Sequence, residues 1–293
     1  MKLNNIVFPA PEPGYDMHHP NLFWIPKHSV HTSSIFSSKK EEKDEVSFIP
    51  TIFIPSPVNP KSNNLIIFFH GNAEDAGYSE PMVEYMCHAM DAHAFIAEYP
   101  MYGVYRTEPP SEETIYADSL AIYTFATAFM KFEPEDIILI GRSLGSGPAT
   151  YLASQRKVKA LVLFSPYKSI RSVAVDHVPV VGWLIQERFN NLSNIKNVAS
   201  PCFILHGQKD TVIGWNHGVT LYENCKSIMK ELKTPPEMTH NTFHLNHDFI
   251  DPLKDFLKKI DERIVLLRKT TGEKIEKRPP ILIILEKYRQ RQL

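Results

Sequence analysis

The chain has 293 residues, of which 43% are hydrophobic and 22% charged, a composition typical of globular proteins that excludes wholesale disorder. Its 32 basic and 33 acidic residues leave a formal net charge of −1 at pH 7, so no general electrostatic attraction to nucleic acid exists. The three cysteines, Cys87, Cys202 and Cys225, form neither a CxxC pair nor a disulfide framework, which suits a reducing compartment.

The N-terminus carries no recognisable targeting signal. Residues 1–15 lack the apolar core of a signal peptide, and no run reaches the roughly 20 apolar residues of a membrane span. Lys2 follows the first methionine and no cysteine precedes Cys87, so N-terminal myristoylation and palmitoylation are not expected. We therefore expect a cytoplasmic protein that can rest peripherally on membranes.

The first 60 residues are rich in proline, which withholds a backbone donor and favours extended edge segments over helices. Residues 29–36 and 47–54 predict a hairpin within this part. We interpret the chain as a proline-rich extension with edge strands of the same domain (1–60), a domain core (61–265) and a basic and apolar tail (266–293).

The core alternates short apolar runs with stretches of helical spacing. The runs, which predict strands buried on both faces, are 65–69, 94–99, 137–140, 160–164 and 202–205. The helical stretches are 79–91, 111–131, 145–156, 216–232 and 248–266. Ser111 is expected to cap the second helix. This alternation predicts an α/β fold with a mostly parallel sheet covered by helices on both faces, and a ligand site at the carboxyl ends of its strands.

The strongest chemical motif is the G-x-S-x-G sequence from Gly141 to Gly145, directly after the third apolar run. Between a strand and a helix, this pattern is typical of a nucleophile elbow, in which small neighbours allow a sharp turn that exposes the serine hydroxyl. We predict Ser143 as the nucleophile and the backbone N–H of Leu144 as an oxyanion donor. The alternative interpretation is a glycine-rich turn without function.

A second loop follows the first apolar run and reads His70-Gly71-Asn72-Ala73. Folds with a nucleophile elbow take their second oxyanion donor from a backbone N–H at this point. Asn72 is the first choice for that donor and Ala73 the second. His70 is expected to brace the loop and not to act as the base.

A serine hydroxyl needs a base near neutral pH, and the base needs an acid to orient it. Asp210 follows the last apolar run, in the expected chain order of serine, acid and histidine; the alternative is a solvated turn carboxylate. His240, His244 and His247 precede the final helix. We prefer His240 as the base because it comes soonest after the last strand, and keep His247 as the alternative.

Six segments of the chain resemble the α/β-hydrolase-domain-containing protein 17 family, serine hydrolases that act as protein depalmitoylases. They are VFPAPEPGY (7–15), HGNAEDAG (70–77), PSEETIYAD (110–118), EDIILIGRSLGSGPATYLA (135–153), SPYKSIRSVA (165–174) and ILHGQKDTVIGWNHGVTLYENC (204–225). The similarity covers about residues 3–256 and implies an α/β-hydrolase fold with a short cap. It also implies catalytic roles for Ser143, Asp210 and His240.

The chain departs from that family at two places. Family members carry a cysteine-rich, palmitoylated N-terminus, whereas no cysteine precedes Cys87 here. The family also has an acidic residue two positions after the catalytic histidine, where this chain has Thr242.

The stretch 177–189 is amphipathic and is expected to lie over the site. Its apolar residues either line an acyl groove or simply cover the sheet; they are Val180, Val181, Trp183, Leu184 and Phe189. The tail (262–293) combines basic residues with the apolar run 281–285. It either docks on an anionic membrane or a partner, or packs on the domain edge.

Together these patterns predict a serine hydrolase that cleaves acyl thioesters or esters, with an acylated protein or a small acyl ester as substrate. No metal or organic cofactor is expected. Two alternatives remain open: a soluble small-molecule esterase or peptidase, and a catalytically silent hydrolase-fold subunit that binds partners.

Overall fold

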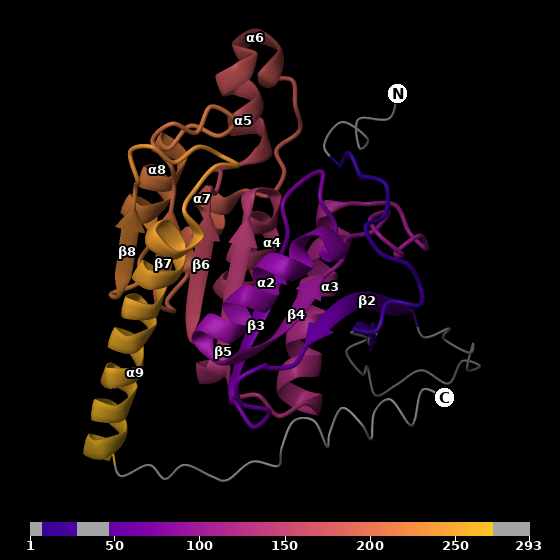
Figure 1. Ribbon diagram of the computed structural model, residues 1–293. Coiled ribbons are helices and arrows are strands. Elements are labelled where there is room, and N and C mark those ends of the chain that lie inside the picture. The colour runs from indigo at the N-terminus through magenta and orange to yellow at the C-terminus, as the bar shows by residue number, and fades with distance from the viewer. Residues whose placement is uncertain (1–7, 28–46, 272–293) are drawn as a thin grey trace, which may run out of the picture.

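A computed structural model describes residues 8–27 and 47–271. Its centre is an eight-stranded sheet with the order β1-β2-β4-β3-β5-β6-β7-β8 (Figure 1). The strands are β1 (Leu22–Pro26), β2 (Phe48–Ile54), β3 (Asn64–Phe69), β4 (Ala92–Ala97), β5 (Ile137–Arg142), β6 (Ala160–Phe164), β7 (Cys202–Leu205) and β8 (Lys230–Lys233). Strand β2 is antiparallel to both of its neighbours, and the remaining pairs are parallel, so the predicted mostly parallel sheet is confirmed.

Helices cover both faces of this sheet. They are α2 (Ala76–Met90), α3 (Glu112–Thr124), α4 (Ser146–Gln155), α5 (Ile170–His177), α6 (Pro179–Gly182), α7 (Asn191–Asn194), α8 (Asn216–Asn224) and α9 (Asp251–Thr271). Short turns of other helical type are η1 (Phe125–Phe129), η2 (Pro134–Asp136), η3 (Ser143–Gly145), η4 (Ile195–Asn197) and η5 (Leu245–Ile250). Ser111 caps α3 by accepting the backbone N–H of Thr114, as the sequence predicts.

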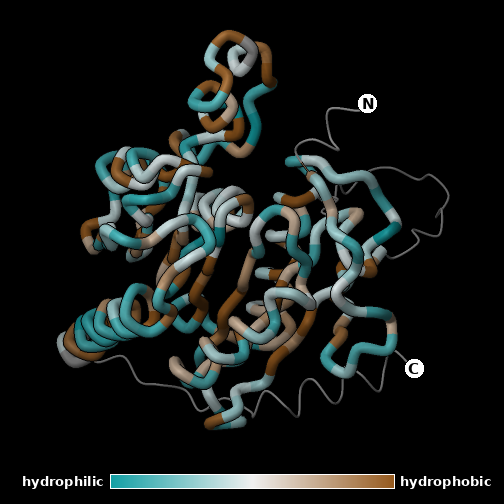
Figure 2. The backbone as a smooth tube through the Cα atoms, turned by 45° about the horizontal axis from the view of Figure 1, so that its top comes forward, coloured by the Kyte–Doolittle hydropathy of each residue, from teal (hydrophilic) through white to brown (hydrophobic). Residues whose placement is uncertain are grey.

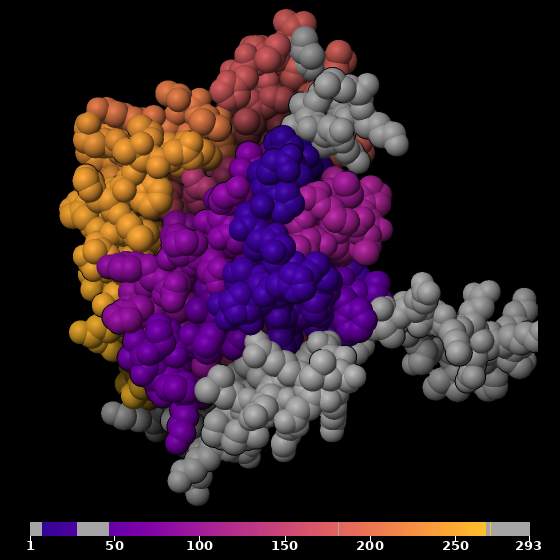
Figure 3. All heavy atoms as spheres, turned by 45° about the vertical axis from the view of Figure 1, so that its right-hand side comes forward, coloured from indigo at the N-terminus to yellow at the C-terminus, as the bar shows by residue number. Residues whose placement is uncertain are grey.

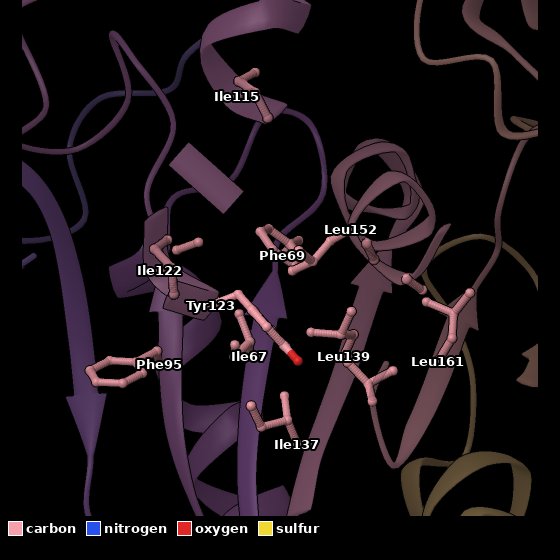
Figure 4. Close-up of a cluster of buried hydrophobic side chains, with 14 of the residues drawn as sticks. Ile67, Phe69, Phe95, Ile115, Ile122, Tyr123, Ile137, Leu139, Leu152 and Leu161 are labelled. Carbon is pink, nitrogen blue, oxygen red and sulfur yellow. The ribbon is translucent and has the colours of Figure 1, made fainter. Parts of the chain in front are cut away.

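The core consists of two apolar layers, one on each side of the sheet. Ile67 and Phe69 of β3 face α3 and α4, together with Leu139 and Leu152 (Figure 4). Phe68 and its alternate neighbours face α2 and α9 on the opposite side. Side chains along a strand point alternately to opposite faces, so continuous apolar runs are needed where both faces are covered. Figure 2 shows these runs as hydrophobic segments through the centre of the molecule.

Two edge strands differ from the predictions. Residues 230–233 form β8, although the sequence predicts a helix over 216–232, because α8 ends at Asn224 and the charged segment then pairs with β7. Charged residues are typical of an edge strand, where they discourage further pairing. On the other edge, β1 is the antiparallel partner of β2. The predicted hairpin partner, residues 29–36, lies outside the described residues, as does the tail from residue 272.

The segment between β6 and β7 forms the cap. Helices α5 and α6 project beyond the carboxyl ends of the parallel strands (Figure 1), and Figure 3 shows this projection standing above the body of the molecule. Over residues 8–27 and 47–271, none of the helices combines the length and apolarity that crossing a bilayer would require.

Candidate active site

The G-x-S-x-G motif forms a sharp turn between β5 and α4. Ser143 adopts φ 49°, in the left-handed region that side chains other than glycine rarely occupy. A Cβ atom at Gly145 would lie 2.0 Å from the Phe69 carbonyl oxygen, and one at Gly141 would lie 2.4 Å from the Gly145 carbonyl oxygen. The turn therefore requires glycine at both positions because the backbone of β3 and the turn itself fill the space of a side chain.

Ser143, His240 and Asp210 come together in one chain of hydrogen bonds. The Oγ atom of Ser143 lies 3.1 Å from Nε2 of His240, and Nδ1 of His240 lies 2.8 Å from Oδ2 of Asp210. With the carboxylate accepting at Nδ1, that nitrogen carries the proton and Nε2 is left to accept from the serine hydroxyl. The three residues follow β5, β7 and β8, whose carboxyl ends meet at one edge of the sheet.

Asp210 is held as a buried carboxylate. Its Oδ1 atom accepts the backbone N–H groups of Val212 and Ile213 at 2.9 and 2.8 Å. Burial opposes ionisation, but hydrogen bonds from His206, His240 and the Ile213 backbone outweigh it, so the pKa of Asp210 lies well below its ordinary value. Asp210, ionised at neutral pH, can orient the imidazole of His240 and stabilise it when it gains a proton.

The other two late histidines lie away from Ser143. The side chain of His247 is 88% exposed, and its Nδ1 atom lies 2.8 Å from Oδ1 of Asp248. His244 is also exposed, and its backbone N–H donates to Asp248. Of the three late histidines, the structure brings His240 to the serine.

The predicted oxyanion loop packs directly against the elbow. The space beside Gly145 is filled by the carbonyl oxygens of Phe69 and His70, so the two loops are in backbone contact. Ala73 adopts φ 58°, and its N–H lies 3.2 Å from the side-chain oxygen of Asn72. Leu144 lies within the η3 turn directly after Ser143. The oxyanion roles of Leu144, Asn72 and Ala73 stay predictions, and the N–H of Ala73 already donates to the side-chain oxygen of Asn72.

His70 lies fully buried below this loop and pairs with Glu98. Its Nε2 atom lies 3.0 Å from Oε1 of Glu98, and its Nδ1 atom lies 2.9 Å from the Gly71 carbonyl oxygen. Burial lowers the pKa of His70, but the hydrogen bond and the negative charge of Glu98 outweigh it and raise the pKa above its ordinary value. The sequence identified His70 as a brace but gave no indication of Glu98, which follows β4.

The N-terminal PAPEPGY segment supports the same loop. The hydroxyl of Tyr15 donates to Oε2 of Glu98 at 2.8 Å, and the N–H of Gly14 donates to Oδ2 of Asp75 at 2.6 Å. Asp75 in turn caps α2 by accepting the N–H of Tyr78. These contacts join a segment at the start of the chain to the loop after β3, a relationship that no local pattern reveals.

The predicted groove residues occupy two different environments. Val180, Trp183 and Leu184 are 86%, 69% and 84% exposed at the tip of the cap. Phe189 is fully buried and packs edge-on against Phe8 and Tyr116. The side chain of the fifth residue, Val181, lies outside the described part of the structure.

The chain is similar in sequence to known α/β-hydrolase domain-containing proteins. No family model matches the chain. The chain is 32% identical over 198 residues to α/β-hydrolase domain-containing protein aho-3 of Caenorhabditis elegans, covering 68% of this chain and 58% of that protein. It is 31% identical over 211 residues to protein 17C of Xenopus laevis, covering 72% and 66%. The chain therefore spans less than two thirds of the length of these two relatives.

Solved structures share the fold. An esterase of Pyrococcus furiosus, Pf2001, superposes with a TM-score of 0.66 at 14% identity, over 85% of this chain and 97% of that chain. Est1E from Butyrivibrio proteoclasticus gives a TM-score of 0.58 at 18% identity, over 83% and 99%. The predicted α/β-hydrolase fold is therefore confirmed. The sequence relatives show that the chain belongs to the α/β-hydrolase domain-containing protein 17 family.

Proposed function

We propose that the protein is a serine hydrolase that cleaves acyl thioesters or esters, with Ser143 as nucleophile, His240 as base and Asp210 as the orienting acid. One observation carries the proposal: the hydrogen-bond chain from Asp210 through His240 to Ser143, with spacings of 2.8 and 3.1 Å. The left-handed φ of Ser143 supports it, because strained backbone of this kind concentrates at functional sites.

Acylation begins when Oγ of Ser143 attacks the carbonyl carbon of the substrate and Nε2 of His240 takes the hydroxyl proton. The carbonyl oxygen becomes an oxyanion, which the backbone N–H groups of Leu144 and Asn72, with Ala73 as the alternative to Asn72, stabilise by hydrogen bonds. When the tetrahedral intermediate collapses, the bond to the thiol or alcohol breaks and His240 returns the proton to that leaving group.

Deacylation repeats the same steps with water. His240 takes a proton from water as the water oxygen attacks the acyl-serine, and collapse of the second intermediate releases a carboxylic acid and restores the Ser143 hydroxyl. Throughout, Asp210 holds the proton on Nδ1 and offsets the positive charge of the imidazolium. The net reaction is hydrolysis of one ester or thioester bond.

The substrate class that we propose is an S-acylated protein, as for a palmitoyl-protein thioesterase. The resemblance in the six sequence segments supports this class, and the short cap supports access by a protein surface. Val180, Trp183 and Leu184 are apolar and exposed, and they lie in or directly after α6, which stands beyond the carboxyl ends of the strands (Figure 1), so we expect them to contact an acyl chain. Phe189 is fully buried beneath the cap beside Gly147, so it supports the cap from below and is not exposed to an acyl chain.

Labelling with a fluorophosphonate probe tests the mechanism directly, because the probe reacts with activated serines. We expect the wild-type protein to be labelled, and Ser143→Ala and His240→Ala to abolish labelling. His247→Ala is the matched control, since its side chain pairs with Asp248, and it should label like the wild type. Absence of labelling in the folded wild-type protein would support a silent partner-binding subunit instead.

A series of acyl substrates then distinguishes the substrate classes. Thioesters and oxygen esters with acyl chains of increasing length should give rising kcat/KM with chain length if the substrate is a palmitoylated protein. A preference for short oxygen esters would favour a small-molecule esterase instead; the structural neighbour Pf2001 is itself an esterase.

A further inference from the structure

Arg142 precedes the proposed nucleophile and contacts two other loops of the site. Its Nη1 atom donates to Oε1 of Glu74 at 2.7 Å. Its Nη2 atom donates to Oδ1 of Asn241 at 2.8 Å and lies 3.5 Å from the carbonyl oxygen of His240. Both charged side chains are largely shielded from solvent, with 14% of Arg142 and 19% of Glu74 exposed.

Each contact reaches a different functional segment. Glu74 belongs to the loop after β3 that carries the proposed oxyanion donors, and its Oε1 atom also accepts the N–H of Gly71. Asn241 follows His240 directly, so its position and that of the proposed base are linked through one peptide unit. A single guanidinium group therefore joins the elbow, the oxyanion loop and the histidine loop.

The contacts at position 142 suit an arginine side chain better than a lysine side chain. The planar guanidinium presents donors in two directions, whereas the ammonium of lysine is one compact charge on a flexible stem. The guanidinium carbon also lies 5.9 Å from the centre of the Phe164 ring, which gives the group a further fixed neighbour. Gly71 allows the close approach, since a Cβ atom there would lie 2.6 Å from Oε1 of Glu74 and 3.1 Å from Nη1 of Arg142.

We propose that Arg142 is a positioning residue, which sets the geometry of the reacting groups through its hydrogen bonds to Glu74 and Asn241. These two hydrogen bonds together are called the clasp. The inference rests on the proposed function, because its consequence is a rate. Loosening the clasp lets His240 and the oxyanion loop move relative to Ser143 without removing any group that touches the substrate. Such a loss should lower kcat and leave KM nearly unchanged.

The experiment compares Arg142→Gln, Arg142→Lys and Glu74→Gln in the full chain, with kcat and KM measured on one thioester. We expect kcat to fall about 30-fold in Arg142→Gln and about tenfold in Glu74→Gln, with KM within about twofold, because sub-ångström misplacement of reacting groups is costly. Arg142→Lys should remain well below wild type, since lysine restores the charge but not the two-way contact. The double variant should resemble Arg142→Gln alone, because the two residues act as one unit.

Lys157→Gln is the control, as Lys157 forms an ion pair with Glu135 in which its own side chain is 70% exposed. It should retain wild-type kcat. Three results would overturn the proposal. They are wild-type kcat in both Arg142→Gln and Glu74→Gln, a fall in kcat of the double variant equal to the product of the two single falls, and wild-type kcat in Arg142→Lys. If Arg142→Gln does not fold, Glu74→Gln and Arg142→Lys still decide it.

A second measurement separates failure of the clasp from failure of the proposed function. Hydrogen exchange should accelerate in peptides covering 70–75 and 239–243 in Arg142→Gln, and remain unchanged in Lys157→Gln. Unchanged exchange in Arg142→Gln would overturn the clasp even in an active enzyme. Accelerated exchange in Arg142→Gln, combined with no fluorophosphonate labelling of the wild-type protein, would support the clasp and reject the hydrolase function.

Discussion

Asp210 and His240 stand 30 positions apart in the chain, yet Oδ2 of Asp210 lies 2.8 Å from Nδ1 of His240. The contact exists because the two residues follow β7 and β8, which are parallel neighbours whose carboxyl ends lie at the same edge of the sheet. The imidazole is thereby oriented with its other nitrogen toward Ser143.

Replacing Asp210 by asparagine should remove the orienting charge while retaining the shape of the site. We expect kcat to fall by about 10²- to 10⁴-fold, because the amide favours the wrong tautomer of His240 and cannot stabilise its positive charge. Asp248→Asn is the matched control, since Asp248 pairs with the exposed His247, and its kcat should stay close to wild type. Equal activity of Asp210→Asn and wild type, measured on the same ester, would remove Asp210 from the mechanism.

The same carboxylate predicts a pH dependence of stability. Burial raises the pKa of Asp210, but the hydrogen bonds it accepts outweigh burial and leave the pKa below the ordinary value of about 3.9. Because the folded pKa is the lower one, ionised Asp210 stabilises the fold above pH about 4 and loses this contribution as the pH falls further. The difference in free energy of unfolding between wild type and Asp210→Asn should therefore shrink between pH about 5 and 2, in urea titrations. A difference independent of pH would contradict this expectation.

Gly145→Ala tests the packing of the elbow. A Cβ atom at this position would lie 2.0 Å from a backbone oxygen of β3, which cannot move aside without disturbing the sheet. We expect the free energy of unfolding to fall by about 3 kcal/mol or more. Gly214→Ala is the control, because its nearest neighbour is the movable Asn216 side chain, and it should cost less than about 1 kcal/mol. Similar melting temperatures for the two variants would show that the elbow can relax.

Trp183→Ala tests the proposed acyl contact at the cap. The side chain is 69% exposed, so its removal should leave the melting temperature nearly unchanged. Turnover of long-chain substrates should fall more than turnover of short-chain substrates, because only the long chain reaches the cap. Ile228→Ala is the control, because it removes an apolar side chain that is 83% exposed between α8 and β8. It should change neither the melting temperature nor the turnover of long-chain substrates. Equal losses on long and short chains in Trp183→Ala would reject the groove.

Phe189→Ala should behave differently from Trp183→Ala because Phe189 is fully buried against Phe8 and Tyr116. Removing the Phe189 ring should lower the free energy of unfolding by about 3–5 kcal/mol, because apolar burial is lost and a cavity is left. Urea denaturation of the two cap variants measures the contrast. Equal stabilities would show that the surroundings of Phe189 collapse around the smaller side chain.

Local sequence determined the elements whose signal lies within a few residues. The apolar runs of β3 and β5 specify strands buried on both faces, and Ser111 specifies the start of α3, because these features depend on neighbours close in the chain. The glycines around Ser143 likewise predict a sharp turn without knowledge of the rest of the fold. Strand β8 escaped prediction because its charged residues pair with β7 at an edge that only the assembled sheet creates.

By itself, the sequence determined the fold class and the placement of Ser143 and Asp210 after buried strands, since both follow from local patterns and chain order. It favoured His240 as the base and kept His247 as the alternative. In the tertiary structure, Nε2 of His240 lies 3.1 Å from Oγ of Ser143, whereas Nδ1 of His247 lies 2.8 Å from Oδ1 of Asp248. The contacts of Glu98 with His70 and of Arg142 with Glu74 were likewise decided only by folding. Each joins residues from separate strand ends, and no local periodicity records which strand ends will meet.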